Sequence, residues 1–188
     1  MKPLPTPHIV VTEQRAPFFV TEEEIAAWLE LERSCKYVRE TDPNCGPEVE
    51  QFQKFCGGQK GDSWCDDFQS WAIYQVWPHF VLRRSASCQQ TRIMAATLGW
   101  LQHRGTEPRV GDLGLVIDVA RDHAHHIFAV SSPMRADKTF NTIEGNTNPA
   151  GGSNGYGVFE RETRRMGGRT TYEFIRFPRK ATQVKHAA

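Results

Sequence analysis

The amino-acid sequence predicts an α+β fold, with N-terminal helices packed on a mostly antiparallel C-terminal β-sheet. Segments with helical spacing of apolar residues and with helix-start residues all lie before residue 108. Beyond that residue the apolar segments are short, rich in β-branched and aromatic residues, and separated by turn residues. Helices followed by strands are typical of α+β proteins. The length of 188 residues suits one domain with a single core.

The chain divides into one folded domain and two terminal extensions. Residues 1–18 contain early prolines and are expected to be an extended lead-in. Residues 19–180 hold every predicted helix and strand and are expected to fold as the single domain. Residues 181–188 are expected to be a frayed tail. We find no internal repeat and no second module, so we expect a monomeric protein of one domain.

The first two helices are predicted from their start signals. In "TEEEIAAWLELERS", Thr21 can cap the helix and Glu24 completes a capping box. Ile25 and Trp28 begin the apolar stripe of this helix. The turn "TDPNCGP" leads into "PEVEQFQKF", where Pro47 suits the first position of the second helix.

Two further helices are predicted before the sheet. The Gly-rich stretch "GGQKGD" is expected to be a loop. Residues 64–76 follow it as a helix, with Ser63 as the N-cap and Asp66 three residues later. Ser87 then caps a helix through "CQQTRIMAATLGWLQHR", which Gly105 is expected to close.

The second half of the chain is expected to form the sheet. Five segments combine β-branched or aromatic residues with turn residues on either side, which is the pattern of short strands. In chain order they are "GDLGLVIDV", "HHIFAVSS", "TFNTIEGN", "GVFERET" and "TYEFIRF".

Composition and charge exclude several classes of protein. Apolar residues make up 39% and charged residues 24% of the chain, which is ordinary for a globular protein. No apolar run is long enough to span a bilayer, so no membrane insertion is expected. The formal net charge of +1 gives no general attraction to nucleic acid. The N-terminal sequence lacks the pattern of a secretory signal, so we expect synthesis in the cytoplasm without a signal peptide.

Basic residues are concentrated toward the C-terminal end. They could form a solvated face, or they could contact an anionic substrate or polymer, and the sequence leaves both interpretations open. These residues are Arg161, Arg164, Arg165, Arg169, Arg176, Arg179 and Lys180.

The cysteine count leaves at least one free thiol. There are five cysteines, and an odd number cannot pair completely. No two of them have the C-x-x-C spacing of a zinc ribbon or a thioredoxin-type site. Pairing is otherwise open among Cys35, Cys45, Cys56, Cys65 and Cys88.

Cys65 is the candidate nucleophile. It lies in the first turn of a predicted helix, where free backbone N–H groups and the helix dipole favour a thiolate. The same N–H groups could stabilise an oxyanion on an attacked carbonyl. The following Asp66 and Asp67 oppose a thiolate by their charge. A core cysteine on an amphipathic helix is the alternative for this stretch.

A nucleophilic thiol needs a base, and three of the seven histidines cluster at the opening of a predicted strand, at His123, His125 and His126. His126 is a polar residue entering an otherwise apolar strand. With Asp118 or Asp122 the cluster could instead hold a metal, but its spacing fits no metal motif. We therefore expect no metal and no cofactor.

The stretch "NTIEGNTN" offers a third group for the site. Glu144 and Asn146 are two residues apart, so on a strand their side chains would share a face. Either could hold an imidazole through its second nitrogen. The alternative is a strand that simply runs into an Asn/Gly turn.

Taken together, these stretches resemble the CHAP-type cysteine amidase/peptidase family, a papain-like group of peptidoglycan hydrolases. "NCGPEVEQF" and "SWCDDFQSW" resemble the segment before the nucleophile and the nucleophile motif. "VGDLGLV", "HHIFAV" and "TIEGNTN" resemble the Gly-Asp strand entry, the His-bearing strand and the Glu-Gly-Asn turn, and "GYGVFERETR" resembles the strand that follows. The matches run in the family's order over most of the chain.

The resemblance implies a papain-like fold with the nucleophile Cys at a helix N-terminus, and it makes the folded domain a CHAP-like catalytic domain. Cys65 would be the nucleophile and His126 the general base, with His125 as the competitor for that role. Glu144 would orient the imidazole, and Asn146 would be a nearby polar member of the site. The sequence departs from the family where an acidic residue follows the nucleophile and where bulky residues follow the histidine.

The implied activity is hydrolysis of an amide bond in the peptidoglycan stem peptide or at its junction with the sugar, as an N-acetylmuramoyl-L-alanine amidase or a peptidoglycan endopeptidase. The protein would act at the bacterial cell wall or in the periplasm after export, as a phage lysin or as an antibacterial effector with a cognate immunity protein. The alternatives are a transglutaminase-like or protein-directed cysteine enzyme, and an inactive structural or binding module of a phage particle.

Overall fold

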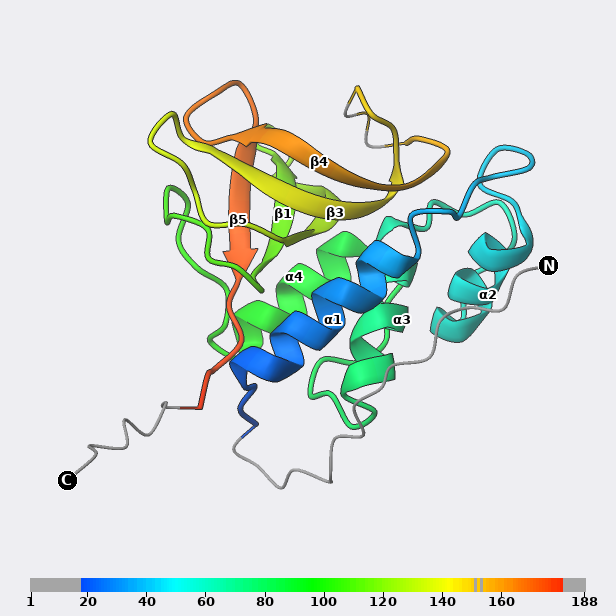
Figure 1. The fold of residues 1–188 in the computed structure, drawn as a ribbon, viewed down its shortest axis with the longest axis horizontal. Coiled ribbons are helices and arrows are strands. Elements are labelled where there is room, and N and C mark those ends of the chain that lie inside the picture. Colours follow the sequence, from blue (N-terminus) through cyan, green and yellow to red (C-terminus); the bar gives the residue numbers. More distant parts are fainter. Residues whose placement is uncertain (1–17, 151, 153, 181–188) are drawn as a thin grey trace.

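A computed structural model describes residues 18–150, 152 and 154–180. Within them the chain forms an α+β fold, as the sequence predicts (Figure 1). The expected tail and all but the last residue of the expected lead-in lie outside the described residues. The helices are α1 (Glu22–Ser34), α2 (Pro47–Cys56), α3 (Cys65–Val76) and α4 (Cys88–Thr97). The strands are β1 (Leu113–Asp118), β2 (His123–Val130), β3 (Thr139–Thr147), β4 (Gly157–Arg165) and β5 (Thr171–Ile175).

The first two helices begin where the sequence predicts. The Glu24 N–H donates to the Thr21 hydroxyl at 3.2 Å, and the Thr21 N–H donates to the Glu24 carboxylate at 2.8 Å. This reciprocal capping box confirms the predicted start of α1. Pro47 is the first residue of α2, where its missing N–H costs no hydrogen bond.

The predicted cap of α3 was wrong. The N-cap is Trp64 rather than Ser63, and no side chain caps the helix. Asp66 does not reach back toward Ser63, because its carboxylate is buried and accepts a hydrogen bond from the Thr91 hydroxyl of α4 at 2.7 Å. A tertiary contact has therefore taken the carboxylate that the local pattern assigned to the helix start.

Helix α4 ends earlier than predicted. It stops at Thr97, and Gly99 takes the left-handed conformation (φ +71°) that ends a helix, rather than Gly105. The Trp100 N–H then donates to the Ala95 carbonyl at 2.9 Å, and the Gly99 N–H donates to the Ala96 carbonyl. These two bonds form a Schellman motif, which turns the chain toward the sheet.

The sheet has the strand order β4-β3-β2-β1-β5, and every neighbouring pair is antiparallel. Helix α3 contacts α1 and α2 as well as strands β2 and β3, so it links the helices to the sheet (Figure 1). The main core lies between these layers. Its aromatic centre includes Trp28, Trp77, Phe80 and Phe177, whose contacting ring centroids are 5.0–6.1 Å apart.

The sheet curls around a second, smaller apolar cluster. Phe140 on β3 and Phe174 on β5 have ring centroids 6.1 Å apart, although β2 and β1 lie between them in the sheet. In a flat sheet, strands three places apart would be about 14 Å apart. The sheet therefore bends far enough for residues of distant strands to meet. The cluster comprises Val116, Phe128, Val130, Phe140, Tyr172 and Phe174.

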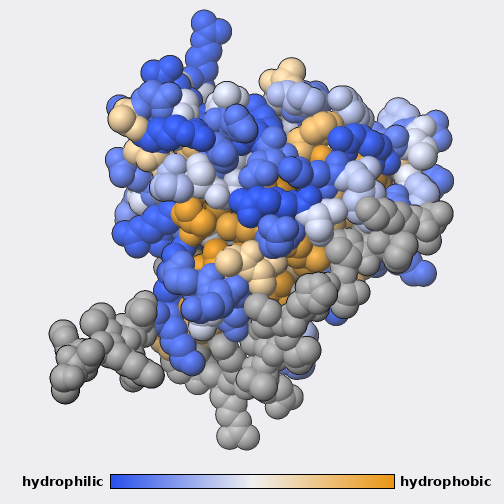
Figure 2. All heavy atoms as spheres, in the orientation of Figure 1, coloured by the Kyte–Doolittle hydropathy of each residue, from blue (hydrophilic) through white to orange (hydrophobic). Residues whose placement is uncertain are grey.

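The molecular surface is mainly polar in the view of Figure 2, where apolar residues gather near the middle of the face, between the sheet and the helices. None of the helices in the described part of the chain is long and apolar enough to cross a membrane.

Candidate active site

Cys65 is the first residue of α3 and is almost fully buried, with an exposed fraction of 4%. The preceding residue, Trp64, fixes this helix start. Its ring stacks on Phe52, and its indole N–H donates to Glu40 Oε1 at 2.8 Å. The sulfur of Cys65 is thus held at the positive end of a twelve-residue helix.

His126 lies on β2 and is completely buried. Its Nε2 is 2.8 Å from Glu144 Oε2 on the neighbouring strand β3. Burial lowers the pKa of His126, but the interactions with Cys65 and Glu144 outweigh it and raise this pKa above the ordinary value. Because Glu144 occupies Nε2, the free nitrogen Nδ1 is the one left to take the Cys65 proton.

Glu144 is a buried carboxylate held by several donors. Arg164 binds it through two bonds, Nε to Oε1 at 2.7 Å and Nη2 to Oε2 at 2.6 Å, and the Thr142 hydroxyl donates to Oε1. Burial by itself would raise the pKa of Glu144. The Arg164 charge and the bonds from His126 and Arg164 instead hold the pKa well below its usual range. The residue beside the imidazole is therefore charged at neutral pH, as the orienting role requires.

The thiol of Cys65 contacts a second thiol. The Sγ atoms of Cys65 and Cys88 are 3.4 Å apart, and Cys88 is the first residue of α4. This contact, followed by the interactions with His126 and the backbone N–H of Asp66, holds the pKa of Cys65 well below its ordinary value despite burial. Cys65 and His126 thus each favour the charged form of the other.

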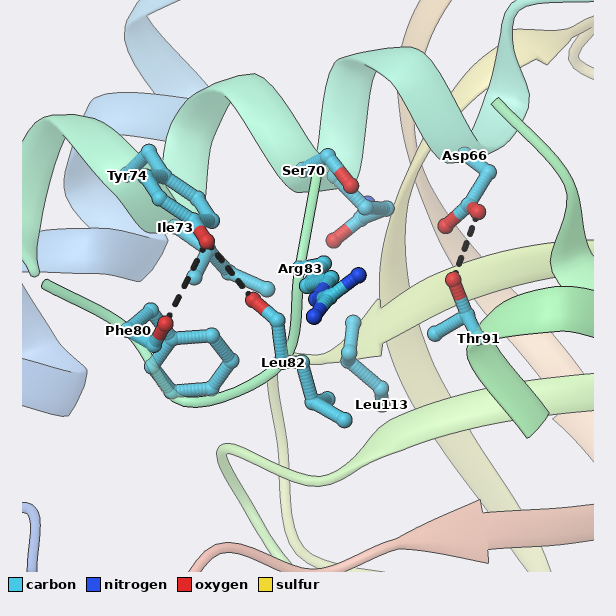
Figure 3. Close-up of a pocket in the computed structure, with 10 residues that line it drawn as sticks. Asp66, Ser70, Ile73, Tyr74, Phe80, Leu82, Arg83, Thr91 and Leu113 are labelled. Atoms are coloured by element: carbon cyan, nitrogen blue, oxygen red, sulfur yellow. Dashed lines mark hydrogen bonds between the residues drawn. The ribbon is translucent and has the colours of Figure 1, made fainter. Parts of the chain in front are cut away.

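The two aspartates after Cys65 are buried rather than solvated. Figure 3 shows Asp66 directed toward Thr91, beside a pocket of about 10 Å³ that has room for a single water. Burial raises the pKa of Asp66 to about 7 and that of Asp67 to about 8. Much of each carboxyl is therefore neutral at pH 7, which reduces the opposition to a Cys65 thiolate expected from the sequence.

Asn146 is buried near the end of β3, but its side-chain amide has no hydrogen-bond partner among the described residues. Its φ of +52° is left-handed, and the strand pairing is irregular between Glu144 and Thr147. The regular alternation that would put Asn146 and Glu144 on one face is thus interrupted. Gly145 between them lies against Trp64 and Phe68, which brings this stretch to the start of α3.

The other members of the histidine cluster do not join this arrangement. His123 and His125 are exposed. Asp122 is paired with Arg92 and Arg104, and Asp118 accepts hydrogen bonds from the backbone of its own turn. No group of three or more His, Cys, Asp or Glu residues in the described part of the chain is arranged to hold a metal ion.

The late basic residues do not form one solvated face. Arg164 is buried in the site, Arg176 is paired with Asp112, and Arg179 is paired with Glu22. Arg164 is a site residue that the sequence did not reveal, because nothing in its local pattern separates it from its basic neighbours.

Cys88 was also missed by the sequence analysis. The sequence held one signal for it, namely its position directly after the capping residue Ser87. This position places the Cys88 sulfur at a helix start, like the sulfur of Cys65.

A groove lies near Trp64, although Cys65, His126, Glu144 and Asn146 are not part of its lining. Its volume is about 370 Å³, and its lining includes Glu40, Asn148 and Tyr156. Glu40 accepts the indole hydrogen bond of Trp64, the residue before Cys65, so the groove lies beside the start of α3.

A thiolate at a helix start, a buried imidazole and a fixed carboxylate can together perform acyl transfer. No family model matches this sequence, and no curated protein shows a significant match to it.

Proposed function

We propose that this protein is a papain-like cysteine hydrolase that cleaves an amide bond of bacterial peptidoglycan. The observation that carries the proposal is that Cys65, at the start of α3, interacts electrostatically with His126, whose Nε2 lies 2.8 Å from Glu144. A nucleophile, a base and a group that orients the base are the parts that acyl transfer requires. The sheet position of His126 and Glu144, on neighbouring strands beside a helix-borne Cys65, supports the papain-like assignment.

In the first half of the reaction, Nδ1 of His126 holds the proton of Cys65. The thiolate attacks the amide carbonyl carbon, and the carbonyl oxygen becomes an oxyanion that backbone N–H groups at the start of α3 can stabilise. The carbon–nitrogen bond then breaks, and His126 gives its proton to the leaving amine. The acyl group remains on Cys65 as a thioester.

In the second half, His126 removes a proton from a water molecule, which attacks the thioester carbonyl. The carbon–sulfur bond breaks, the carboxyl product leaves, and the proton on His126 restores the thiolate–imidazolium pair. Glu144 stays ionised throughout and stabilises the positive imidazole, because Arg164 keeps its pKa low.

The resemblance of the motifs to CHAP-type hydrolases supports peptidoglycan as the substrate. The groove near the start of α3 is lined largely by polar residues, including Asn148 and Tyr156, which suit a peptide or sugar chain. The protein would then act at the bacterial cell wall after export by a phage lysis system or a secretion apparatus. As an antibacterial effector it would have a cognate immunity protein.

The test is digestion of purified peptidoglycan, with the fragments identified by mass spectrometry. Cys65→Ala is expected to lower the rate at least about 10³-fold, because it removes the thiol that interacts with His126. His126→Ala is expected to have a similar effect. His125→Ala is the matched control, and its rate is expected to stay within a few-fold of wild type because His125 is exposed.

The fragments also identify the scissile bond. An amidase frees the amine of the first stem residue, whereas an endopeptidase frees an amine within the stem. Undiminished digestion by Cys65→Ala would contradict the proposed mechanism. Release of amines from protein substrates but not from peptidoglycan would support the protein-directed alternative instead.

A further inference from the structure

Two cysteines begin two helices at the same point of the molecule. Cys65 opens α3 and Cys88 opens α4, and their sulfur atoms are 3.4 Å apart. Both side chains are buried, with exposed fractions of 4% and 6%. A separation of 3.4 Å is within reach of an S–H···S hydrogen bond, with either sulfur as the donor.

The start of α4 is held in place from three sides. The Ser87 hydroxyl caps it by accepting the Gln90 N–H at 3.3 Å. The Thr91 hydroxyl donates to Asp66, next to Cys65, at 2.7 Å. The Gln89 side-chain oxygen accepts the N–H of Ala124, two residues before His126, at 2.8 Å. Cys88 is thus fixed relative to both the thiol and the strand that carries the imidazole.

Of the two sulfur atoms, one carries a proton and the other a negative charge, and their surroundings show which is which. Two thiolates in contact in a buried site would repel each other strongly, so only one of the two sulfurs can carry the negative charge. Cys65 has His126 as a partner cation, whereas the contacts described for Cys88 give it no such cation. The charge therefore belongs on Cys65, and Cys88 keeps its proton and donates it. The N-terminal ends of α3 and α4 both favour that negative charge.

We propose that Cys88 is a positioning residue for the nucleophile: its thiol donates a hydrogen bond to the Cys65 sulfur and holds it as a thiolate next to His126. This proposal rests on the proposed function for the role of Cys65. It also gives Cys88 a part in releasing the product, because the hydrogen bond stabilises the Cys65 thiolate again when the thioester breaks. The pKa directions agree, since the contact lowers the pKa of Cys65 and raises that of Cys88.

The experiment measures the rate at which iodoacetamide alkylates Cys65 as a function of pH, with peptide mapping to count that cysteine alone. In Cys88→Ala, the midpoint of the pH profile is expected to rise by about one unit, so that alkylation at pH 6 is about 10-fold slower than in wild type. In Cys88→Ser, which keeps a donor, the shift is expected to be smaller. Cys45→Ala is the control, because Cys45 lies in the turn before α2 and its midpoint should match wild type.

A structural role alone would lower the melting temperature of the variants without moving the midpoint, and that result would overturn the proposal. If Cys88→Ala does not fold, Cys88→Val, which has a similar size and no donor, takes its place: a midpoint raised above wild type supports the donor role, and a wild-type midpoint overturns it. The assay needs no peptidoglycan. A shifted midpoint in a protein that does not digest peptidoglycan would therefore refute the proposed substrate and leave the role of Cys88 standing.

Discussion

Arg164 makes it possible for a charged glutamate to lie in the interior beside His126. An isolated buried carboxylate would be neutral, because burial disfavours its charge. Two hydrogen bonds from Arg164 supply the opposite charge, and the guanidinium itself lies 4.3 Å from the Phe128 ring centroid. Glu144 then presents a negative oxygen to Nε2 of His126.

Replacing Arg164 by Met keeps the apolar stem and removes the charge. The pKa of Glu144 is then expected to rise, and the rate of the proposed amide hydrolysis at pH 7 to fall on the order of 10- to 100-fold, because a neutral Glu144 no longer supports the imidazolium. A pH–rate profile measures the change. The matched control is Arg165→Met, at the exposed next position of β4, which should leave the profile unchanged.

The loss of stability in Arg164→Met should also depend on pH. The pKa of Glu144 in the folded protein lies below its value of about 4.3 in the unfolded chain. The ionised carboxylate therefore stabilises the fold above about pH 4.3, and this stabilisation is lost as the pH falls through the folded pKa. Arg164→Met is therefore expected to be less stable than wild type at pH 7, with a difference that shrinks below about pH 4. Urea unfolding at several pH values measures it. A constant difference at all pH values would show that Arg164 acts only by packing.

At the scale of elements, Gly145 sets how closely β3 approaches α3. A Cβ at this position would lie 2.8 Å from the Phe68 side chain and 2.9 Å from Trp64. The strand that carries Glu144 could not come as close to the helix start with any larger residue. The glycine between Glu144 and Asn146 is therefore a packing requirement of the site.

Gly145→Ala is expected to destabilise the protein by about 1–3 kcal/mol, because the contacting atoms belong to a buried helix and cannot move away freely. It should also lower the proposed hydrolytic activity, since Glu144 moves with its strand. Gly168→Ala is the control, because a Cβ there meets only the Arg165 carbonyl at 3.9 Å, and its effect should be within about 0.5 kcal/mol. Thermal unfolding and peptidoglycan digestion measure the two effects. If Gly145→Ala and Gly168→Ala behaved equally in both assays, the close approach of β3 to α3 would be unimportant.

At the scale of the whole molecule, burial of carboxyl groups makes stability depend on pH. Asp67 has no hydrogen-bond partner for either carboxylate oxygen among the described residues, and burial raises its pKa to about 8. The pKa of Asp67 in the folded protein lies above its value of about 3.9 in the unfolded chain. Its contribution to stability is therefore complete below about pH 3.9 and is lost as the pH rises through the folded pKa. Asp66 acts in the same direction, with a pKa of about 7.

The free energy of unfolding is therefore expected to fall between about pH 4 and pH 8, by an amount on the order of a few kcal/mol. Asp67→Asn, which mimics the neutral carboxyl, should reduce this dependence and be the more stable protein at pH 8. Asp42→Asn is the control at an exposed position. Equal slopes of stability against pH in wild type and Asp67→Asn, measured by urea unfolding, would rule out Asp67 as a source of the dependence.

The curl of the sheet is the whole-molecule feature on which the site depends. Arg164 on the edge strand β4 lies 5.7 Å from the ring of Tyr172 on the opposite edge strand β5. This curvature encloses the Glu144 carboxylate between strands, where the Arg164 bonds are shielded from water. A flat sheet with the same strand order would leave that ion pair exposed and weak.

The fold class, the order of the elements and the start of α1 could be predicted from the sequence, because they depend on capping residues and on the period of apolar residues, which are local. The sequence also singled out Cys65, His126 and Glu144 as site candidates. The contacts of Arg164 and Cys88 with these residues, and the hydrogen bond of Asp66 with Thr91 in place of a cap on α3, appear only in the folded structure. These are contacts between residues 20 or more positions apart, formed where the sheet curls and two helix starts meet, and no local pattern of residues encodes them.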